Sequence, residues 1–234
     1  MSFMICDRIN EVQEQIRIHC EKVHRNPSEV TLIAVSKTKP LEMIQEAFGG
    51  GQLCFGENKV QEMCEKATDF PEKSVQWHLI GHLQSNKVKK AVSVAAMIHS
   101  VDSVALACEI DKYAAKMNKQ QDILLEVNVA EEESKFGITL ENAEETVRDV
   151  AKLEHVRLRG FMTVAPFTED EETNRPYFHS LHQLMVDINA KSIDNIHIDV
   201  LSMGMSGDYR VAVEEGATHV RVGTYIFGQR NYNI

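Results

Sequence analysis

A lysine at position 37 ends an apolar stretch, and its amine is the first candidate for chemistry in this chain. Residues 31–37 read TLIAVSK. An ammonium group at the edge of a hydrophobic core costs free energy unless it has a partner or a function. A lysine amine in such a place can attack a carbonyl compound and form a Schiff base. The bland alternative is a charge that extends into solvent at the end of a strand. From this stretch alone, both interpretations of Lys37 stay open.

Two segments near the C-terminus have the composition of an anion-binding site. Residues 201–216, LSMGMSGDYRVAVEEG, predict a serine- and glycine-rich turn that opens a helix, with Ser206 as its N-cap. Free backbone N–H groups and the positive end of the helix dipole favour an anion there. Further along, Gly223 allows close approach and Thr224 offers a hydroxyl. Ordinary turn chemistry explains either segment alone. Asp208 would repel an anion, so we expect its side chain to face away.

Strand-like and helix-like segments alternate along the whole chain. The strand-like segments are 31–36, 53–57, 76–81, 97–101, 122–129, 156–165, 197–203 and 219–227. The helix-like segments are about 4–24, 41–48, 59–67, 104–119, 141–153, 177–190 and 206–215, with a weaker signal at 86–96. Such alternation favours a parallel sheet covered on both faces. The eight units predict an α/β fold, a closed (β/α)8 TIM-type barrel. The competitor is an open doubly wound sheet, but the first strand lacks the GxGxxG that usually follows it.

The barrel is expected to be a single domain over residues 1–234 that begins with a helix. No helix is expected after the eighth strand, and the N-terminal helix is expected to take its place. Side chains alternate along a strand, so Ile33, Val35 and Lys37 share one face. Barrel interiors favour branched residues, which makes this the interior face. Lys37 would then reach the C-terminal mouth, where active sites lie in this fold.

The seventh predicted strand leads into the first anion-binding segment, and the eighth predicted strand contains the second. Phosphate commonly binds after these two strands in such barrels. In a closed barrel the eighth strand neighbours the first, so Lys37 would lie beside the phosphate. An aldehyde that carries a phosphate, pyridoxal 5′-phosphate (PLP), fits this pair because the amine forms an aldimine and the phosphate anchors the other end. Arg221 would meet the pyridine nitrogen and keep it unprotonated. The alternative for Arg221 is a salt bridge with Glu57 or Glu126.

Six motifs resemble the pyridoxal-phosphate homeostasis protein family, also called proline synthetase co-transcribed bacterial homologs, which is related to the N-terminal barrel of alanine racemase. They are AVSKTKP at 34–40, FGENKVQE at 55–62, WHLIGHLQSNK at 77–87, SKFG at 134–137, RGFMTVAP at 159–166 and LSMGMSGDYRVAVEEGATHVRVGTYIFG at 201–228. The resemblance runs from about residue 5 to the end. Lys59 departs from it, since the family pattern has tyrosine there.

The resemblance implies a fold-type III PLP barrel and gives each candidate site residue a role. Lys37 would carry the covalent aldimine, and Arg221 would contact the ring nitrogen. The phosphate would be held by Ser202, Gly223 and Thr224, together with Ser206. Asn58 and His82 would lie near the ring. No residue is assigned a catalytic role.

The resemblance also implies a protein that carries PLP and maintains vitamin B6 and amino-acid homeostasis, without established turnover. PLP-dependent apo-enzymes are the candidate partners. The alternative is a small PLP-dependent amino-acid racemase or decarboxylase that acts through Lys37. Racemisation needs two bases, and in the resembling racemases the second comes from a further β domain, which we do not expect here. Of the tyrosines, only Tyr225 is a candidate for a position at the mouth of the barrel. A monomer is expected.

A third class of function is a sugar-phosphate aldolase that forms an imine on the same lysine. Such a protein would lack the visible colour of a PLP aldimine.

Composition narrows the class of protein further. The chain has a formal net charge of −10, which argues against nucleic-acid binding and against anionic membrane surfaces. Its five cysteines are widely spaced with no CxxC, which predicts free thiols and a cytoplasmic protein. No apolar run approaches the length of a membrane span. His78 and His82 are four apart but lack a third ligand, so no metal is expected.

Overall fold

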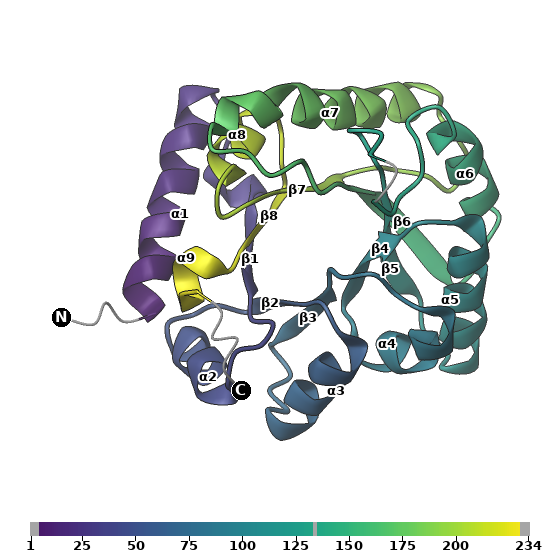
Figure 1. Ribbon diagram of the computed structural model, residues 1–234. Helices are drawn as coiled ribbons and strands as arrows, with labels where there is room; N and C mark the ends of the chain where they lie inside the picture. The colour runs from purple at the N-terminus through teal and green to yellow at the C-terminus, as the bar shows by residue number, and fades with distance from the viewer. Residues whose placement is uncertain (1–4, 133–134, 230–234) are drawn as a thin grey trace.

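Eight parallel strands close into a barrel in the computed structural model, which describes residues 5–132 and 135–229. Figure 1 shows the ring of strands with helices around it. The strands are β1 Thr31–Val35, β2 Cys54–Glu57, β3 Gln76–Leu79, β4 Met97–Val101, β5 Gln121–Glu126, β6 Val156–Met162, β7 Val200–Met205 and β8 His219–Val222. Each strand pairs with the next, and β1 pairs with β8 with Ile33 opposite Arg221. The predicted (β/α)8 barrel is confirmed.

Helices cover the outer face of the sheet. They are α1 Ile5–Lys22, α2 Leu41–Gly49, α3 Val60–Asp69, α4 Val88–Val94, α5 Val104–Lys116, α6 Ala143–Val150, α7 Arg175–Ala190, α8 Tyr209–Glu214 and α9 Thr224–Phe227. Short 3-10 turns lie at Pro27–Glu29, Ser85–Lys87 and Glu171–Asn174. In the described part of the chain, no helix combines the length and the apolar character that crossing a bilayer requires.

The N-terminal helix closes the outer ring, as the sequence predicted. Helix α1 buries an apolar stripe at helical spacing, which consists of Ile5, Ile9, Val12, Ile16 and Cys20. Figure 1 shows α1 beside α8, α9 and α2. The predictions about the eighth strand were wrong in two respects. The strand ends at Val222 and does not continue to 227, and the short helix α9, Thr224–Phe227, follows it although no helix was expected there.

The core has two parts. The larger part lies between the strands and the helices, and on β1 it includes Leu32 and Ala34. Inside the barrel, a small apolar cluster consists of Met97, Leu124, Met162 and Val200. Two other β1 residues, Ile33 and Val35, are outside this part of the core, and both would meet a Cβ added at Gly56 of β2, so they share the opposite face and the predicted alternation along this strand holds.

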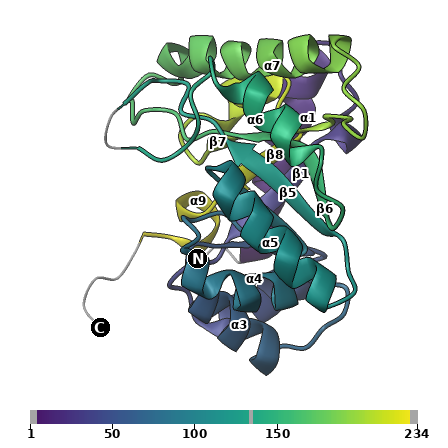
Figure 2. The same ribbon diagram turned by 90° about the vertical axis from the view of Figure 1, so that its right-hand side faces the viewer.

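Loops at one end of the barrel build the mouth. Figure 2 shows helix α9 and the loops after β5 and β6 on the same side of the barrel. In a parallel barrel this is the side where all eight strands end, and active sites of the fold are built from these loops.

Candidate functional site

A cavity of about 410 Å³ opens at the mouth, where β1, β7 and β8 end. Five of the eight residues predicted for the site line it: Lys37, Ser206, Arg221, Gly223 and Thr224. Figure 1 shows the three strands side by side, although β1 and β8 come from opposite ends of the chain. Closure of the barrel therefore brings the lysine and the anion-binding segments to one place.

The turns that follow β7 and β8 are joined directly. The backbone N–H of Gly223 donates to Ser206 Oγ at 3.2 Å. Gly223 also allows β8 to approach β1, because a Cβ added there would lie 3.0 Å from Val35 Cβ and 3.1 Å from the Val35 carbonyl oxygen. A side chain at position 223 would thus narrow the cavity from its β1 side.

Ser206 is not the N-cap of the helix that follows, contrary to the sequence prediction. Helix α8 begins at Tyr209, with Asp208 in the cap position, and Ser206 lies in the preceding turn. Asp208 also differs from expectation, since it is buried and lines the cavity instead of facing away. Its carboxylate is engaged within the protein: Oδ1 accepts from Met205 N at 2.6 Å, and Oδ2 accepts from Asn174 Nδ2 at 2.9 Å. These donors compensate the negative charge beside the anion-binding turn.

Arg221 is buried below the cavity with its guanidinium in a fixed position. Nη1 donates to Ser202 Oγ and Nη2 donates to the carbonyl of Thr163, each at 2.7 Å. Burial lowers the pKa of Arg221 to about 10, although the nearby carboxylates of Asp208 and Glu126 oppose this shift, so the group is cationic at neutral pH. No ion pair between described side chains joins Arg221 to Glu57 or Glu126, the two alternatives from sequence.

Ser202 lies deeper than the cavity lining and holds Arg221. Its side chain is fully buried, and its hydroxyl also bonds His99 Nδ1 at 2.9 Å. His99 Nε2 in turn lies 2.9 Å from His78 Nδ1. Because a guanidinium only donates, Ser202 accepts from Arg221, and the tautomer of His99 decides whether the same hydroxyl donates to His99 Nδ1 or accepts from it. Ser202 is not among the residues that line the cavity, and its expected contact with a phosphate stays a prediction.

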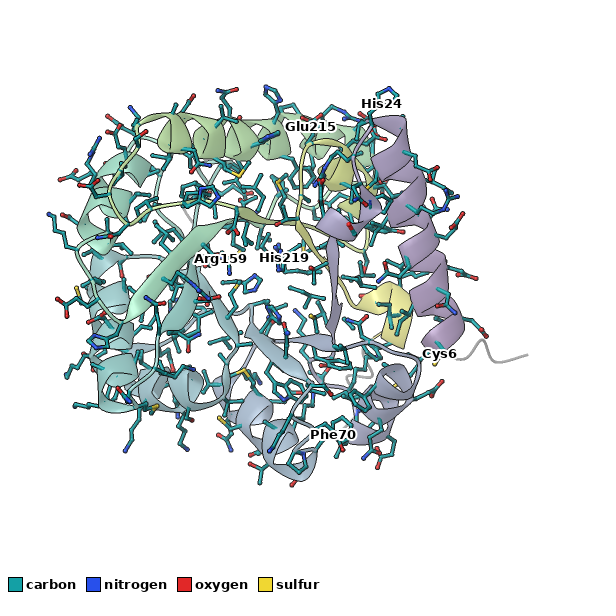
Figure 3. The ribbon with its side chains drawn as sticks, turned by 180° about the vertical axis from the view of Figure 1, so that it is seen from behind. Cys6, His24, Phe70, Arg159, Glu215 and His219 are labelled. Carbon is teal, nitrogen blue, oxygen red and sulfur yellow. The ribbon has the colours of Figure 1, made fainter. Side chains whose placement is uncertain are left out.

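The histidines behind Arg221 are neutral. Burial lowers the pKa of His78 to about 3 and that of His219 to about 4, and it places the pKa of His99 well below its ordinary value. Figure 3, seen from the opposite side to Figure 1, shows His219 and Arg159 toward the middle of the barrel. His99 and Thr163 were missed from the sequence. Alternation along β4 and β6 was the only signal, and it does not distinguish a polar interior from an apolar one.

Asn58 and His82, which the resemblance places near a ring, lie at neighbouring strand ends outside this lining. The ring of His82 stacks on Phe136, with centroids 3.8 Å apart and planes at 15°. His82 Nδ1 lies 3.4 Å from Asp102 Oδ2. Asn58 packs against Gly81, where an added Cβ would lie 2.4 Å from the Asn58 carbonyl oxygen. Neither residue is among those that line the cavity with Lys37, and their place near a ring stays a prediction.

Several lining residues had no signal in the sequence. Lys39 lines the cavity, and its Nζ donates to three carbonyl oxygens at the end of the described chain, those of Phe227, Gly228 and Gln229. The apolar wall consists of Val35, Ile80, Pro166, Phe167 and Met205. Phe167 is 95% exposed at the rim, so it adds apolar surface to the entrance.

Comparisons with known proteins agree with this arrangement. Residues 9–231 match the alanine racemase N-terminal domain family. The chain is 43% identical to the pyridoxal phosphate homeostasis protein of Aquifex aeolicus (strain VF5), over 97% of this chain and 99% of that protein. It is 38% identical to the protein of the same name from Escherichia coli (strain K12), over 98% of both chains.

A solved structure of PipY from Synechococcus elongatus PCC7942, with PLP bound, has the same fold. It is 34% identical to this chain, with a TM-score of 0.85 over 96% of this chain and 100% of that one. The near-complete coverage of the relatives extends the likeness over the whole barrel, including the turns that line the cavity. This chain belongs to the pyridoxal phosphate homeostasis protein family, within the alanine racemase N-terminal domain fold.

Proposed function

We propose that this chain binds PLP in the cavity at the ends of β1, β7 and β8 and carries it for use by other proteins, so that it maintains vitamin B6 balance without a turnover of its own. The observation that supports this most directly is that Lys37, Arg221 and the joined turns of Ser206 and Gly223 line one cavity. The PLP-bound PipY structure, at 34% identity, supports the same ligand. In this assignment, residues 1–234 form one ligand-binding domain.

Each group of the ligand has a counterpart in the cavity. PLP supplies an aldehyde that reacts with primary amines, and the amine of Lys37 is the proposed partner that holds it as an imine. The phosphate is assigned to Ser206, Gly223 and Thr224, which line the same cavity. Ser206 and Thr224 offer hydroxyl groups, and Gly223 has no side chain that would keep a phosphate away from its backbone. Val35 and Ile80 give apolar surface for a ring.

Arg221 is assigned to the ring nitrogen. Two of its five N–H donors are used by Ser202 and Thr163, and the remaining donors can face a ligand. A guanidinium that stays cationic disfavours a protonated ring nitrogen, which weakens the ring as an acceptor of electrons. That property suits holding the cofactor more than demanding carbanion chemistry. Asn58 and His82 are given no contact with the ligand in this proposal.

The racemase or decarboxylase alternative lacks support from the described tyrosines. Tyr225 was the sequence candidate for a second base at the mouth. Its hydroxyl donates to Glu11 of α1 at 2.6 Å, so it is directed toward the outer helix. The carrier is therefore the function that the geometry favours. Its proposed partners are PLP-dependent apo-enzymes, its proposed state is a monomer, and its five free thiols are in keeping with the cytoplasm.

Transfer of the cofactor tests the carrier function. Purified protein loaded with PLP is mixed with a PLP-dependent apo-enzyme, and recovery of that enzyme's activity is followed beside a Lys37→Ala sample treated in the same way. The carrier predicts recovery from the wild-type protein at a rate set by release of PLP, and little from the variant. In parallel, single amino-acid enantiomers are incubated with the loaded protein. Sustained racemisation or decarboxylation that is lost in Lys37→Ala would contradict the carrier function and support the enzyme alternative.

A further inference from the structure

The turn that carries Lys37 has a backbone conformation that its sequence does not favour. Lys39 N–H donates to the Ser36 carbonyl at 3.0 Å, so residues 36–39 form a β-turn with Lys37 and Thr38 at its centre. Thr38 has a φ of 62°. Turns with a positive φ at the second central residue normally take glycine there, and a β-branched residue in that region is an outlier. Something outside the turn must therefore hold Thr38 in place.

Helix α3 supplies the group that holds it. The backbone N–H of Thr38 donates to Glu62 Oε1 at 2.6 Å. The same oxygen accepts from Lys66 Nζ, one helical turn further along α3, at 2.7 Å. The Glu62 side chain is 22% exposed and that of Lys66 is 10% exposed, so this carboxylate is fixed at the edge of the core. A charged acceptor of this kind makes a stronger hydrogen bond with an N–H group than a neutral one.

Lys66 connects Glu62 to the beginning of the same turn. Its Nζ also donates to the Ser36 carbonyl and to Glu57 Oε1 of β2, each at 2.8 Å. An ammonium group has three N–H donors, and these three contacts match that number. Glu57 is fully buried and also accepts from the Ser36 hydroxyl at 2.6 Å. One cation therefore fixes the first residue of the turn and the carboxylate that holds the third.

The conformation of this turn decides where two amines point. Lys37 and Lys39 flank Thr38, and both line the same cavity. Relaxation of Thr38 to a negative φ would rotate the peptide between Lys37 and Thr38. That rotation would change the direction of the Lys37 side chain and its distance from the anion-binding turns. Cofactor binding through one particular lysine thus depends on a residue that does not line the cavity.

We infer that Glu62, itself held by Lys66, is a positioning residue that keeps Thr38 in its left-handed conformation and so directs Lys37 to the aldehyde of the ligand. This inference rests on the proposed binding of PLP. The chemistry that reports it is simple: the lysine amine adds to the aldehyde carbon, a C=N bond forms, and water leaves. Borohydride then delivers hydride to that carbon and leaves a stable secondary amine on whichever lysine had reacted.

The test compares Glu62→Ala with Glu65→Ala, a matched control on the same helix. Glu65 is exposed, and its Oε1 accepts a hydrogen bond from Gln61 Nε2 on the same helix at 2.9 Å. Each protein is loaded with PLP and reduced with borohydride, and the share of label on Lys37 and on Lys39 is measured by peptide mass spectrometry. Wild type and Glu65→Ala are expected to carry the label on Lys37. In Glu62→Ala the Lys37 share is expected to fall several-fold, with a weaker visible imine band.

Two further variants separate positioning from a general loss of structure. Lys66 keeps its contacts with Glu57 and Ser36 when Glu62 is removed, so Glu62→Ala should stay folded, which thermal unfolding checks. Thr38→Gly in the Glu62→Ala background should restore the Lys37 share, because glycine adopts a positive φ without support. Glu62→Gln keeps an acceptor for Thr38 but loses the ion pair, so it should fall between wild type and Glu62→Ala.

An unchanged Lys37 share and imine band in folded Glu62→Ala would overturn the inference while leaving the proposed function intact. Failure of Thr38→Gly to restore the label in the double variant would also overturn it. A wild-type protein that takes no label and shows no visible band would overturn the proposed function, and the inference with it.

Discussion

Arg221 donates a hydrogen bond to Ser202 at 2.7 Å inside the barrel, and both residues are almost completely buried. The Ser202 hydroxyl also forms a hydrogen bond with His99 Nδ1 at 2.9 Å, so the cation at the bottom of the cavity is positioned by neutral groups behind it. The interior of this barrel is therefore partly polar, in contrast to the branched apolar filling that is usual for the fold.

Loss of the Ser202 hydroxyl is expected to weaken both stability and PLP binding. Ser202→Ala leaves an Arg221 donor and His99 Nδ1 without a partner in a buried site, which costs about 1–3 kcal/mol. Chemical denaturation measures the change in unfolding free energy, and a PLP titration measures the change in affinity. Ser93→Ala is the control, because Ser93 lies exposed on α4 and its hydroxyl bonds only the Lys90 carbonyl at 2.8 Å in the described chain. Equal effects of the two substitutions would contradict the role given to Ser202.

A methyl group at position 223 is expected to damage the cavity. In Gly223→Ala the new Cβ would meet Val35 Cβ at 3.0 Å and the Val35 carbonyl oxygen at 3.1 Å, so Val35 or residue 223 must shift by a few tenths of an ångström. Overpacking of this kind costs roughly 1–3 kcal/mol. We expect lower PLP affinity together with a lower melting temperature. Gly49→Ala is the control because an added Cβ there meets nothing within 4 Å. Wild-type affinity in Gly223→Ala would show that the close approach of the two strands is not needed for binding.

The buried histidines predict a loss of stability in acid. The pKa of His78 is lowered to about 3 and that of His219 to about 4, so the unfolded chain binds more protons than the folded one below the ordinary histidine pKa of 6.5. Unfolding free energy should therefore fall as the pH drops below about 6.5, by up to about 1.4 kcal/mol per pH unit for each such histidine. Above that range the histidines contribute no pH dependence.

Replacement of His78 isolates one of these contributions. In His78→Asn, the side-chain amide can still form a hydrogen bond with His99 Nε2, but the titrating group is gone. Denaturation curves at a series of pH values should show a shallower acid slope for this variant than for wild type. His24→Asn is the control, since His24 is exposed beyond the end of α1, at the outer edge of the molecule in Figure 3. Identical slopes in wild type and His78→Asn would refute this account of the acid sensitivity.

Much of the fold could be predicted from the sequence because its signals are local. Short apolar runs that alternate with segments of helical periodicity predict the barrel. Alternation of side chains along residues 31–37 places Val35 and Lys37 on its interior side. The end of β8 was misjudged because the apolar residues of Thr224–Phe227 suit either a strand or a helical turn, and the contact of Tyr225 with Glu11 of α1 decides between them.

The candidate site could be predicted only in part, for a physical reason. Lys37 follows the first predicted strand, and Gly223 and Thr224 lie on the eighth, so barrel topology alone brings them together. The partners of Ser202 and Lys39, and the Asn174 partner of Asp208, are distant in sequence and depend on side-chain packing. The sequence gives no sign that the Ser202 hydroxyl is buried beside Arg221 and His99.

The most direct test of the central claim is the visible spectrum of the purified protein with added PLP, recorded beside Lys37→Ala. We predict a visible imine band in wild type and no such band in the variant. Borohydride should remove the band and leave the reduced cofactor covalently attached to Lys37. A wild-type protein that stays colourless with added PLP, or a Lys37→Ala protein with the same band as wild type, would contradict the claim that Lys37 and the phosphate-binding turns hold one ligand between them.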